Sequence, residues 1–358
     1  MSHRAPGDVA ATSGSEPAQF AGARGGASCQ HGTEDMILVT GGAGYIGSHY
    51  VMHERARGGE VVVLDDLTYG HPEAALDAPF VSGSIGDRAR LDEVFRSYPI
   101  EAVVHFAAFA YVGESVENPG KYYRNNVLGT LTLLEAMRDH GTRFLVFSSS
   151  CATYGDPVYV PMDEEHPQAP INPYGETKLV CEKMLAAFDR AHGIRSVPLR
   201  YFNASGADLQ GRIGESHDPE THLIPLVLQV ATGRRDSVSV FGSDYDTPDG
   251  TCIRDYIHIL DLVQAHALAL DRLRAGLPSR AYNLGTETGH SVREVIGVAE
   301  RVTGRSIRAV DAPRRPGDPP RLVASAARAR AELGWQPRYV NLDETIATAW
   351  RWEQQRRF

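Results

Sequence analysis

A tyrosine and a lysine stand four residues apart, at Tyr174 and Lys178, in a segment whose pattern predicts a helix. Side chains at this spacing lie on one face of a helix, so the phenol and the ammonium are expected to be neighbours. A free phenol has a pKa of about 10, and a nearby positive charge lowers that pKa. Three serines at 148–150 end a predicted strand, and the carboxyl ends of parallel strands face the ligand crevice. These residues predict proton transfer at a substrate hydroxyl.

A glycine-rich turn offers a place for a dinucleotide. The apolar run 36–40 is followed by glycines at positions 41, 44 and 47 and then by a helical pattern. Such glycines allow a tight turn close to a pyrophosphate, and the helix presents free N–H groups to the phosphates. Asp65 ends the next apolar run, where a carboxylate binds ribose hydroxyls and repels a 2′-phosphate, and Asp66 is a second candidate. The pattern predicts NAD and hydride transfer coupled to the proton transfer.

Elements that bring these residues together must form a parallel sheet. Buried apolar runs alternate with helical patterns of ten or more residues, which is typical of βαβ units. We predict an α/β fold of the Rossmann type, with a doubly wound parallel sheet. The expected strands are 36–40, 60–65, 102–106, 143–147 and 195–201, and the expected helices are 44–57, 88–97, 117–140 and 174–192.

Three parts of the chain are distinguished by their composition. Residues 1–35 are rich in Ala, Gly and Ser without apolar periodicity, and we expect a disordered tail. Residues 36–202 carry the alternating pattern and are expected to form the NAD-binding domain. Residues 203–358 are expected to form mainly a smaller substrate-binding portion, with some segments returning to the sheet.

Charge and cysteine usage exclude several other classes of protein. A formal net charge of -9 over 358 residues argues against a nucleic-acid partner, because phosphate binding needs clustered Lys and Arg. There is no run of eighteen apolar residues, so no membrane span is expected. The four cysteines lack CxxC or Cys/His ligand spacing, so we expect reduced thiols in a cytoplasmic protein and no metal site.

Together these motifs resemble the extended short-chain dehydrogenase/reductase family and, within it, the UDP-galactose (UDP-glucose) 4-epimerases. The resemblance runs from Met36 to about Trp352. It rests on these ordered stretches: VTGGAGYIGSH (39–49), VGESVENP (112–119), NNVLGT (125–130), FSSSCATYG (147–155), PYGETK (173–178), LRYFNASGA (199–207), IRDYIHILDL (253–262) and YNLGT (282–286).

This resemblance implies catalytic and cofactor-binding roles. Tyr174 is implied as the catalytic base, Lys178 as the residue that binds the nicotinamide ribose and depresses the tyrosine pKa, and Ser150 as a bridge to the sugar 4-hydroxyl. The implied NAD-binding residues are Gly41, Gly44, Tyr45, Ile46, Gly47, Asp65, Asp66, Ser84, Ile85, Phe106, Ala107, Ala108, Asn126, Lys178 and Tyr201.

A UDP-sugar is the substrate that the resemblance implies. Arg254 and Arg315 would clamp its diphosphate, Asp318 would bind the uridine ribose, and Phe241 would contact the uracil. The implied substrate-binding residues are Ser150, Tyr174, Asn203, His222, Leu223, Phe241, Arg254, Arg315 and Asp318. The implied reaction is reversible C4 epimerisation through a 4-keto sugar, with transient hydride transfer to tightly bound NAD. The resemblance also implies a homodimer.

Four positions depart from the family pattern. Ser84 replaces an aspartate that reaches the adenine, and Ala110 replaces a lysine that several members carry near the cofactor, so tight retention of NAD is an open question. His222 replaces a frequent asparagine beside the substrate. Leu322 occupies a position that often gates N-acetylated sugars, and it is neither the bulky nor the small residue found there, so the exact sugar stays open.

Other functions remain as alternatives. A 4,6-dehydratase needs an acid and a base directly after the serine, where this chain has Cys151 and Ala152. A 4-epimerase acting on a UDP-pentose, UDP-uronate or UDP-N-acetylhexosamine is the nearest rival. A non-catalytic dinucleotide sensor that binds a partner protein has no need of the Tyr–Lys–Ser set. The sensor is therefore a weaker alternative than another UDP-sugar 4-epimerase.

Overall fold

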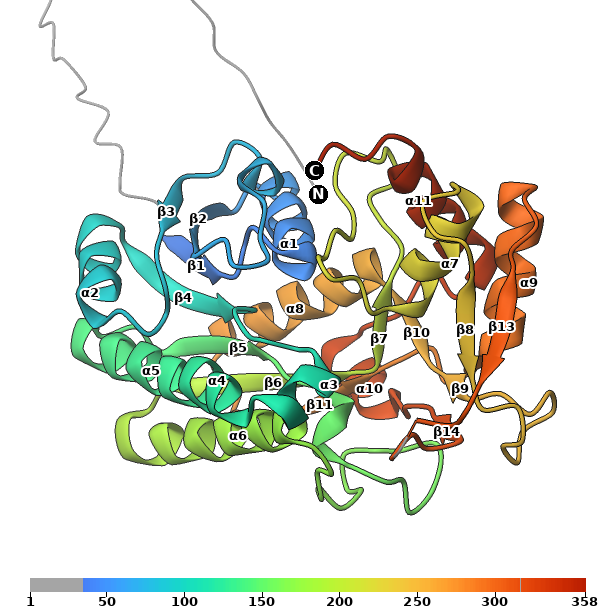
Figure 1. Ribbon diagram of the computed structural model, residues 1–358. Coiled ribbons are helices and arrows are strands. Elements are labelled where there is room, and N and C mark those ends of the chain that lie inside the picture. Colours follow the sequence, from blue (N-terminus) through green and yellow to red (C-terminus); the bar gives the residue numbers. More distant parts are fainter. Residues whose placement is uncertain (1–34, 316) are drawn as a thin grey trace, which may run out of the picture. The chain divides into compact units, whose positions relative to one another are not determined.

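Apolar strands build a single parallel sheet of seven strands with helices on both faces (Figure 1). The computed structural model describes residues 35–315 and 317–358, so the predicted tail falls outside it except for Asp35. The strand order is β11–β6–β5–β4–β1–β2–β3, which confirms the predicted doubly wound Rossmann-type fold. The seven strands are β1 (Met36–Thr40), β2 (Glu60–Asp65), β3 (Phe80–Ser82), β4 (Ile100–His105), β5 (Phe144–Ser148), β6 (Arg195–Tyr201) and β11 (Tyr282–Leu284).

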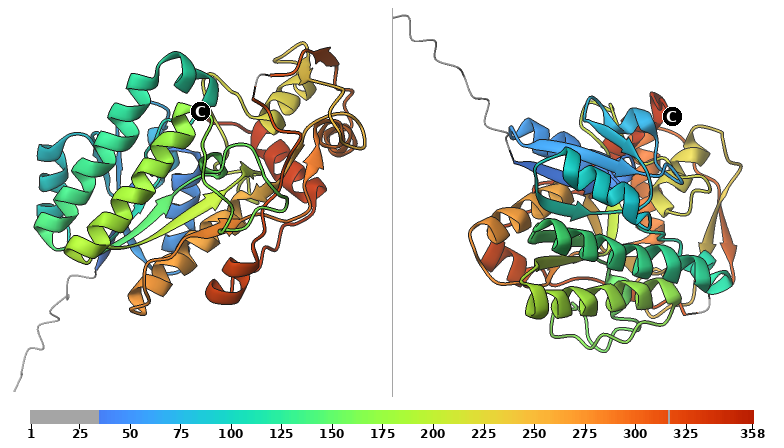
Figure 2. Two further views of the ribbon diagram at one scale, coloured as in Figure 1. Left: turned by 90° about the horizontal axis from the view of Figure 1, so that it is seen from below. Right: turned by 90° about the vertical axis from the view of Figure 1, so that its left-hand side faces the viewer.

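Side-chain alternation along the central strands divides the core into two layers. On β1, Ile37 and Val39 join one buried cluster and Leu38 joins the other, because successive residues of a strand point to opposite faces. One face is covered by α1 (Tyr45–Ala56), α8 (Ile259–Arg274) and α10 (Ala327–Leu333). The other face is covered by α2 (Arg88–Ser97), α5 (Gly129–His140) and α6 (Pro173–His192), and Figure 2 shows α5 and α6 side by side.

Five strands lie where the sequence predicted them, to within two residues at either end. The short strands β3 and β11 were not predicted, because three residues are too few to show a period. The helix predicted over 117–140 is divided: Pro119 follows the capping residue Asn118, whose side chain accepts a hydrogen bond from the Lys121 amide. The segment consists of α3 (Val112–Glu117), α4 (Pro119–Tyr122), the π-helical turn η2 (Tyr123–Leu128) and α5.

Beyond β6 the chain forms a second cluster of short strands and helices around its own apolar core. The helices are α7 (Leu223–Ala231), α9 (Val292–Thr303) and α11 (Leu342–Gln354). Small sheets pair β10 (Tyr256–His258) with β7 (Asn203–Ser205), β13 (Ala309–Ala312) with β8 (Val238–Phe241), and β9 (Ile253–Arg254) with both β12 (His290–Ser291) and β14 (Arg321–Leu322). Two single 3-10 turns complete the described elements, η1 (Pro72–Ala75) and η3 (Cys151–Thr153). Among the described helices, none combines the length and apolarity needed to cross a membrane.

Candidate active site

The first two turns of α6 carry the predicted catalytic pair. Asn172 caps this helix by accepting a hydrogen bond from the Gly175 amide at 2.9 Å, and Pro173 opens it, so Tyr174 and Lys178 lie on consecutive turns. The Nζ atom of Lys178 donates to the carbonyl oxygen of Ser148 at 2.7 Å and lies 5.9 Å from the centroid of the Tyr174 ring. Burial lowers the pKa of Lys178 to about 8. The structure therefore brings the predicted pair to the carboxyl end of β5.

Ser150 lies just beyond β5 and contacts the same phenol. It is buried, and its Oγ accepts a hydrogen bond from the Ala152 amide at 3.1 Å. Burial raises the pKa of Tyr174 above its ordinary range, and the hydrogen bond with Ser150 offsets part of that rise. The lowering predicted from the sequence concerns a site that also holds the positive nicotinamide ring. A second positive charge beside the buried phenol would favour the phenolate.

A buried charge pair between α6 and β6 was missed by the sequence analysis. Glu182 continues the helical face of Tyr174 and Lys178 and accepts from the Arg200 guanidinium, with Nη2 to Oε2 at 2.6 Å. Ser149 Oγ also donates to Glu182 at 2.6 Å. This network ties α6 to the strand end that carries Ser150. The i, i+4 spacing from Lys178 to Glu182 was the available sequence signal.

The glycine turn between β1 and α1 has the geometry of a phosphate cradle. Gly41 has φ +73°, and a Cβ added there would lie 2.6 Å from the Ala107 backbone nitrogen. A Cβ on Gly47 would lie 2.1 Å from the Gly41 carbonyl oxygen, so both positions require glycine. At Gly44, by contrast, only one atom comes within 4 Å. Gly44 caps α1 without a side-chain bond, and no acidic residue stands in the first turn, so the free N–H groups suit a pyrophosphate.

Asp65 lies at the end of β2, beside this turn. It is buried, and its two carboxylate oxygens accept from the Ala43 amide at 3.0 Å and the Leu67 amide at 2.8 Å. Burial raises the pKa of Asp65, and the two backbone donors lower it. Asp66 points away to the Thr68 amide at 3.0 Å. Of the two predicted acids, Asp65 is therefore the one next to the glycine turn.

Several of the remaining predicted cofactor residues hold neighbouring segments in place, and the Phe106–Ala107 backbone lies against Gly41 of the turn. Asn126 exchanges two hydrogen bonds with the backbone of Phe109, both at 2.9 Å, and so holds the loop after β4 that carries Phe106, Ala107 and Ala108. The Tyr45 hydroxyl donates to the Gly206 carbonyl at 2.6 Å. Ile46 and Ile85 pack into the two core layers, and Tyr201 shares a 2.7 Å hydrogen bond with Ser148.

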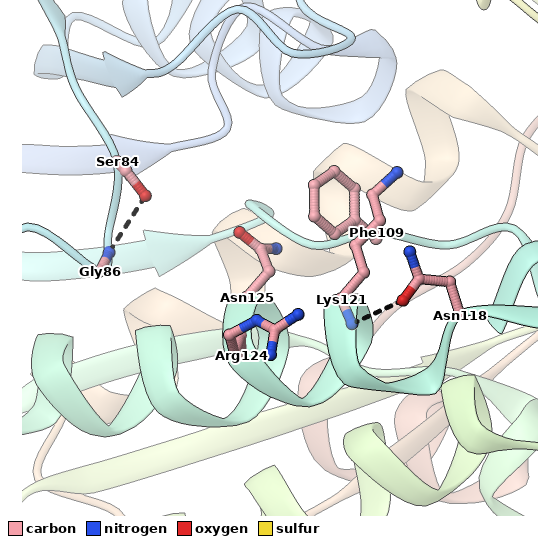
Figure 3. Close-up of a pocket in the computed structure, with 7 residues that line it drawn as sticks. All are labelled: Ser84, Gly86, Phe109, Asn118, Lys121, Arg124 and Asn125. Atoms are coloured by element: carbon pink, nitrogen blue, oxygen red, sulfur yellow. Dashed lines mark hydrogen bonds between the residues drawn. The ribbon is translucent and has the colours of Figure 1, made fainter.

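Ser84 lines a cavity of about 440 Å³ (Figure 3). Two positively charged side chains that the sequence analysis did not single out also line this cavity. Lys121 and Arg124 approach it from α4 and η2, and Lys121 Nζ lies 4.2 Å from the Phe109 ring centroid. Lys121 also donates to Glu114 at 2.6 Å. Ala110 is exposed. The positive charge in this cavity therefore comes from the α4–η2 segment, whereas several family members carry a lysine at the position of Ala110.

The predicted uridine-diphosphate residues gather in the second cluster of elements. Arg254 of β9 forms an ion pair with Asp318, which lies 64 residues further along the chain. The guanidinium carbon of Arg315 lies 3.9 Å from the ring centroid of Phe241, at the end of β8. Leu322 pairs directly with Arg254 across β14 and β9. The structure thus joins arginines, an aromatic ring and a carboxylate, which suits an anionic nucleotide.

Asn203 and the start of α7 complete the predicted substrate set. Asn203 Nδ2 donates to the Asp255 carbonyl oxygen at 3.1 Å, next to Arg254. His222 caps α7 through its backbone conformation and Leu223 is the first helical residue. The His222 imidazole contacts Glu215 instead of lying free for a ligand. Cys151, beside Ser150, has its pKa raised by burial to about 12, which fits a structural thiol better than a nucleophile.

Comparisons with known proteins agree with this geometry. The family model "NAD dependent epimerase/dehydratase family" matches residues 37–285. The UDP-glucose 4-epimerase of Halalkalibacterium halodurans is 53% identical over 319 residues, which cover 89% of this chain and 96% of that protein. The crystal structure of the Brucella ovis UDP-glucose 4-epimerase in complex with NAD is 53% identical, with a TM-score of 0.87, covering 88% of this chain and 97% of that one. The Bifidobacterium longum enzyme in complex with NAD+ and UDP is 38% identical, with a TM-score of 0.85, covering 90% and 98%.

Proposed function

The chain belongs to the NAD dependent epimerase/dehydratase family, and we propose that it interconverts UDP-glucose and UDP-galactose by reversible epimerisation at C4. It is an NAD-dependent enzyme of the isomerase class, as its relatives at about half sequence identity are. The observation that carries the proposal is the attachment of Lys178 to the Ser148 carbonyl, because it fixes Tyr174 and Ser150 at one strand end. A dinucleotide sensor would gain nothing from that arrangement.

Residues of this chain account for the proton transfers. The Tyr174 phenol would accept the proton of the sugar 4-hydroxyl, with Ser150 bridging the two oxygens, and would return it after the sugar has turned. Bound NAD would supply the hydride acceptor and, in its oxidised form, a positive ring beside the phenol. Together with Lys178 this gives the two positive charges that burial of Tyr174 makes necessary.

Substrate binding is proposed to be firm at the nucleotide and loose at the hexose. The Arg254–Asp318 and Arg315–Phe241 contacts hold charged and aromatic groups in fixed positions for the uridine diphosphate. A 4-keto sugar that turns about its diphosphate link can then present either face to the hydride donor. Asn203 is proposed to bind the substrate diphosphate beside Arg254, because both side chains donate hydrogen bonds to backbone carbonyl oxygens of the Ile253–Asp255 segment.

Cofactor retention is proposed to rest on the cavity shown in Figure 3. Ser84 lacks the carboxylate that other members direct to the adenine, whereas Lys121 and Arg124 supply cations and Phe109 supplies an aromatic face. These groups suit the adenosine half of a dinucleotide. The expected aspartate and lysine contacts are then replaced by contacts from the α4–η2 segment.

We also propose a cytoplasmic homodimer, as expected from the sequence. Val127, Leu131 and Leu134 form an apolar stripe at helical spacing, but this stripe does not support the dimer, because Leu134 is fully buried and Val127 packs against the core. Instead, large apolar side chains are exposed on the same segment of chain, namely Val112, Val116, Tyr123 and Leu128. Light scattering of the wild type and of Leu128→Glu tests the proposal: a dimer that becomes a monomer supports it, and a wild-type monomer contradicts it.

The activity is tested by incubating purified protein with UDP-galactose, without added NAD, and following the anomeric protons by NMR. Conversion to UDP-glucose up to a fixed ratio, with no net NADH, is the expected result. The same experiment with UDP-pentoses, UDP-uronates and UDP-N-acetylhexosamines measures the sugar preference. If UDP-galactose is unchanged even after NAD is supplied, while one of these sugars is converted, the proposed substrate is wrong and the reaction type is retained.

A further inference from the structure

Four potential metal ligands converge in the loop between β7 and α7, outside the catalytic set. They are Glu215, His217, Glu220 and His222, in the order E-x-H-x-x-E-x-H. One ligand atom from each side chain lies within 4.8 Å of the ligand atoms of the other three. The sequence analysis expected no metal site because it relied on cysteine and Cys/His ligand spacings, and this pattern contains no cysteine.

Two distances within the cluster match those of a small coordination sphere, and the others depart from it. Nδ1 of His217 lies 3.3 Å from Glu215 Oε1 and 3.6 Å from Glu220 Oε2, and Nδ1 of His222 lies 3.8 Å from Glu220 Oε1. Nδ1 of His222 also contacts Glu215 Oε1 directly. In a tetrahedral zinc site with bonds of about 2.0–2.2 Å, neighbouring ligand atoms lie about 3.3–3.6 Å apart. An ion would therefore fit with small movements of the side chains.

Charge in the cluster requires compensation. The Glu215 and Glu220 side chains are each only 6% exposed, so two carboxylates are held largely out of water. Nδ1 of His217 is buried and finds no hydrogen-bond partner of acceptable geometry within the described chain. Two buried negative charges and a buried nitrogen without a bonding partner need either one divalent cation or a proton on each imidazole.

Backbone contacts hold these ligands in position. The Trp352 indole donates to the Glu215 carbonyl oxygen at 2.9 Å, and Glu220 Oε1 accepts from the amides of Thr221 and His222 at 2.7 and 2.8 Å. His222 is the most open of the four, with its side chain 49% exposed, so an ion can enter from its side. Preorganised ligands of this kind cost little to assemble around a metal.

We propose that Glu215, His217, Glu220 and His222 bind one divalent transition-metal ion of the zinc type, which fixes the loop that leads into α7. Two imidazoles and two carboxylates match the ligand preferences of Zn²⁺ and of Co²⁺ as its spectroscopic substitute. The ion has a structural role, and no step of the reaction passes through it. The proposal is independent of the proposed sugar specificity. In the competing arrangement no ion is bound: burial lowers the pKa values of His217 and His222, but the nearby charges of Glu215 and Glu220 outweigh burial and raise both, so that each imidazole carries a proton.

The test uses the full chain, stripped with a chelator and then titrated with Co²⁺. We expect one Co²⁺ per chain, the intense visible absorption of a four-coordinate ion, and its loss when Zn²⁺ is added. A sulfur-to-metal charge-transfer band would show that cysteines bind instead and would overturn the proposal. So would the absence of stoichiometric binding, together with NMR signals of two protonated imidazoles at neutral pH.

Variants separate this site from adventitious binding. His217→Gln and, as a second variant that keeps the fold if the first does not, Glu220→Gln should each weaken Co²⁺ binding at least tenfold. His192→Gln, at an exposed histidine that ends α6, is the matched control and should bind Co²⁺ as the wild type does. Equal binding by all three variants would mean an adventitious ion only and would contradict the proposal. Melting temperature with and without Zn²⁺ gives a second readout, and it should rise only where the site is intact.

Discussion

Lys178 Nζ lies 5.9 Å from the ring centroid of Tyr174 while it donates to the Ser148 carbonyl at 2.7 Å. The lysine therefore links α6 to β5 through this hydrogen bond and also places a positive charge near the phenol. Its burial lowers its own pKa to about 8, so at neutral pH it still carries most of its charge. The proposed catalytic pair is thus held in position, and further positive charge bound beside the phenol would favour the phenolate.

Replacing Tyr174 by Phe removes the proposed acid and base but keeps the ring. Turnover should fall by about 10²–10⁴-fold, the usual contribution of a positioned proton-transfer group. NAD content, measured after denaturation of the purified variant, should stay at the wild-type level because the cradle lies on β1 and α1. Near-normal turnover in the NMR assay would remove Tyr174 from its assigned role.

Asp65→Asn tests the ribose assignment. The amide can still accept one backbone N–H, but it loses the charge that would bind the ribose hydroxyls, so NAD affinity should fall by about 10–100-fold. Calorimetry on the stripped protein measures this change. Asp77→Asn, at an exposed acid outside the site, is the control. An unchanged dissociation constant for Asp65→Asn would refute the assignment.

The diphosphate clamp is tested with Arg254→Ala. Loss of the guanidinium leaves Asp318 as an unpaired negative charge facing the proposed diphosphate, and KM for the UDP-sugar should rise on the order of 10–100-fold. The exposed Arg235 provides the matched control, because Arg235→Ala removes the same charge elsewhere on the chain. Similar KM values for the two variants would place the diphosphate outside this clamp.

Glu182→Gln tests the buried hydrogen-bond network that Glu182 of α6 forms with Arg200 and Ser149. It leaves the Arg200 guanidinium largely buried without a carboxylate, and breaking such a pair costs about 3–5 kcal/mol of stability. Urea unfolding measures the difference, with Lys183→Gln on the same helix as a control at an exposed charge. A loss below about 1 kcal/mol would show that the pair contributes little to the folded state.

Buried neutral histidine predicts an acid-sensitive fold. Burial lowers the pKa of His266 from 6.5 to about 4, and its Nε2 has no partner among the described residues. As the pH falls from 6.5 to 4, the unfolded chain binds a proton that the folded chain does not, so the free energy of unfolding should fall by up to about 1.4 kcal/mol per pH unit.

His266→Leu removes this titrating group. Urea unfolding of the wild type and the variant between pH 7 and pH 5 should therefore show a shallower loss of stability in the variant. Parallel curves for the two proteins would contradict the assignment. His49, His105 and His258 have lowered pKa values of about 4, 3 and 3, so the variant should still retain part of the acid sensitivity.

Local patterns in the sequence determined the fold class and the catalytic motif. Strand and helix periods, the glycine turn and the four-residue spacing of Tyr174 and Lys178 are short-range features, so the chain alone predicts the Rossmann sheet and the phenol–ammonium pair. The division of the chain at residue 202 and the individual site roles stay predictions. Even so, β11 from the later half of the chain does pair with β6.

Only the tertiary structure decided which distant residues meet. Three groupings depend on packing: the Arg254–Asp318 pair, the approach of Lys121 and Arg124 to the Ser84 cavity, and the Glu215–His222 cluster. Their residues lie in loops and short elements, where no sequence period constrains the path of the chain. Burial likewise raises the pKa of Tyr174, which spacing along the chain does not reveal, because desolvation depends on what packs around the ring. Spacing sets neighbours along an element, whereas long-range contacts and dielectric surroundings arise from packing.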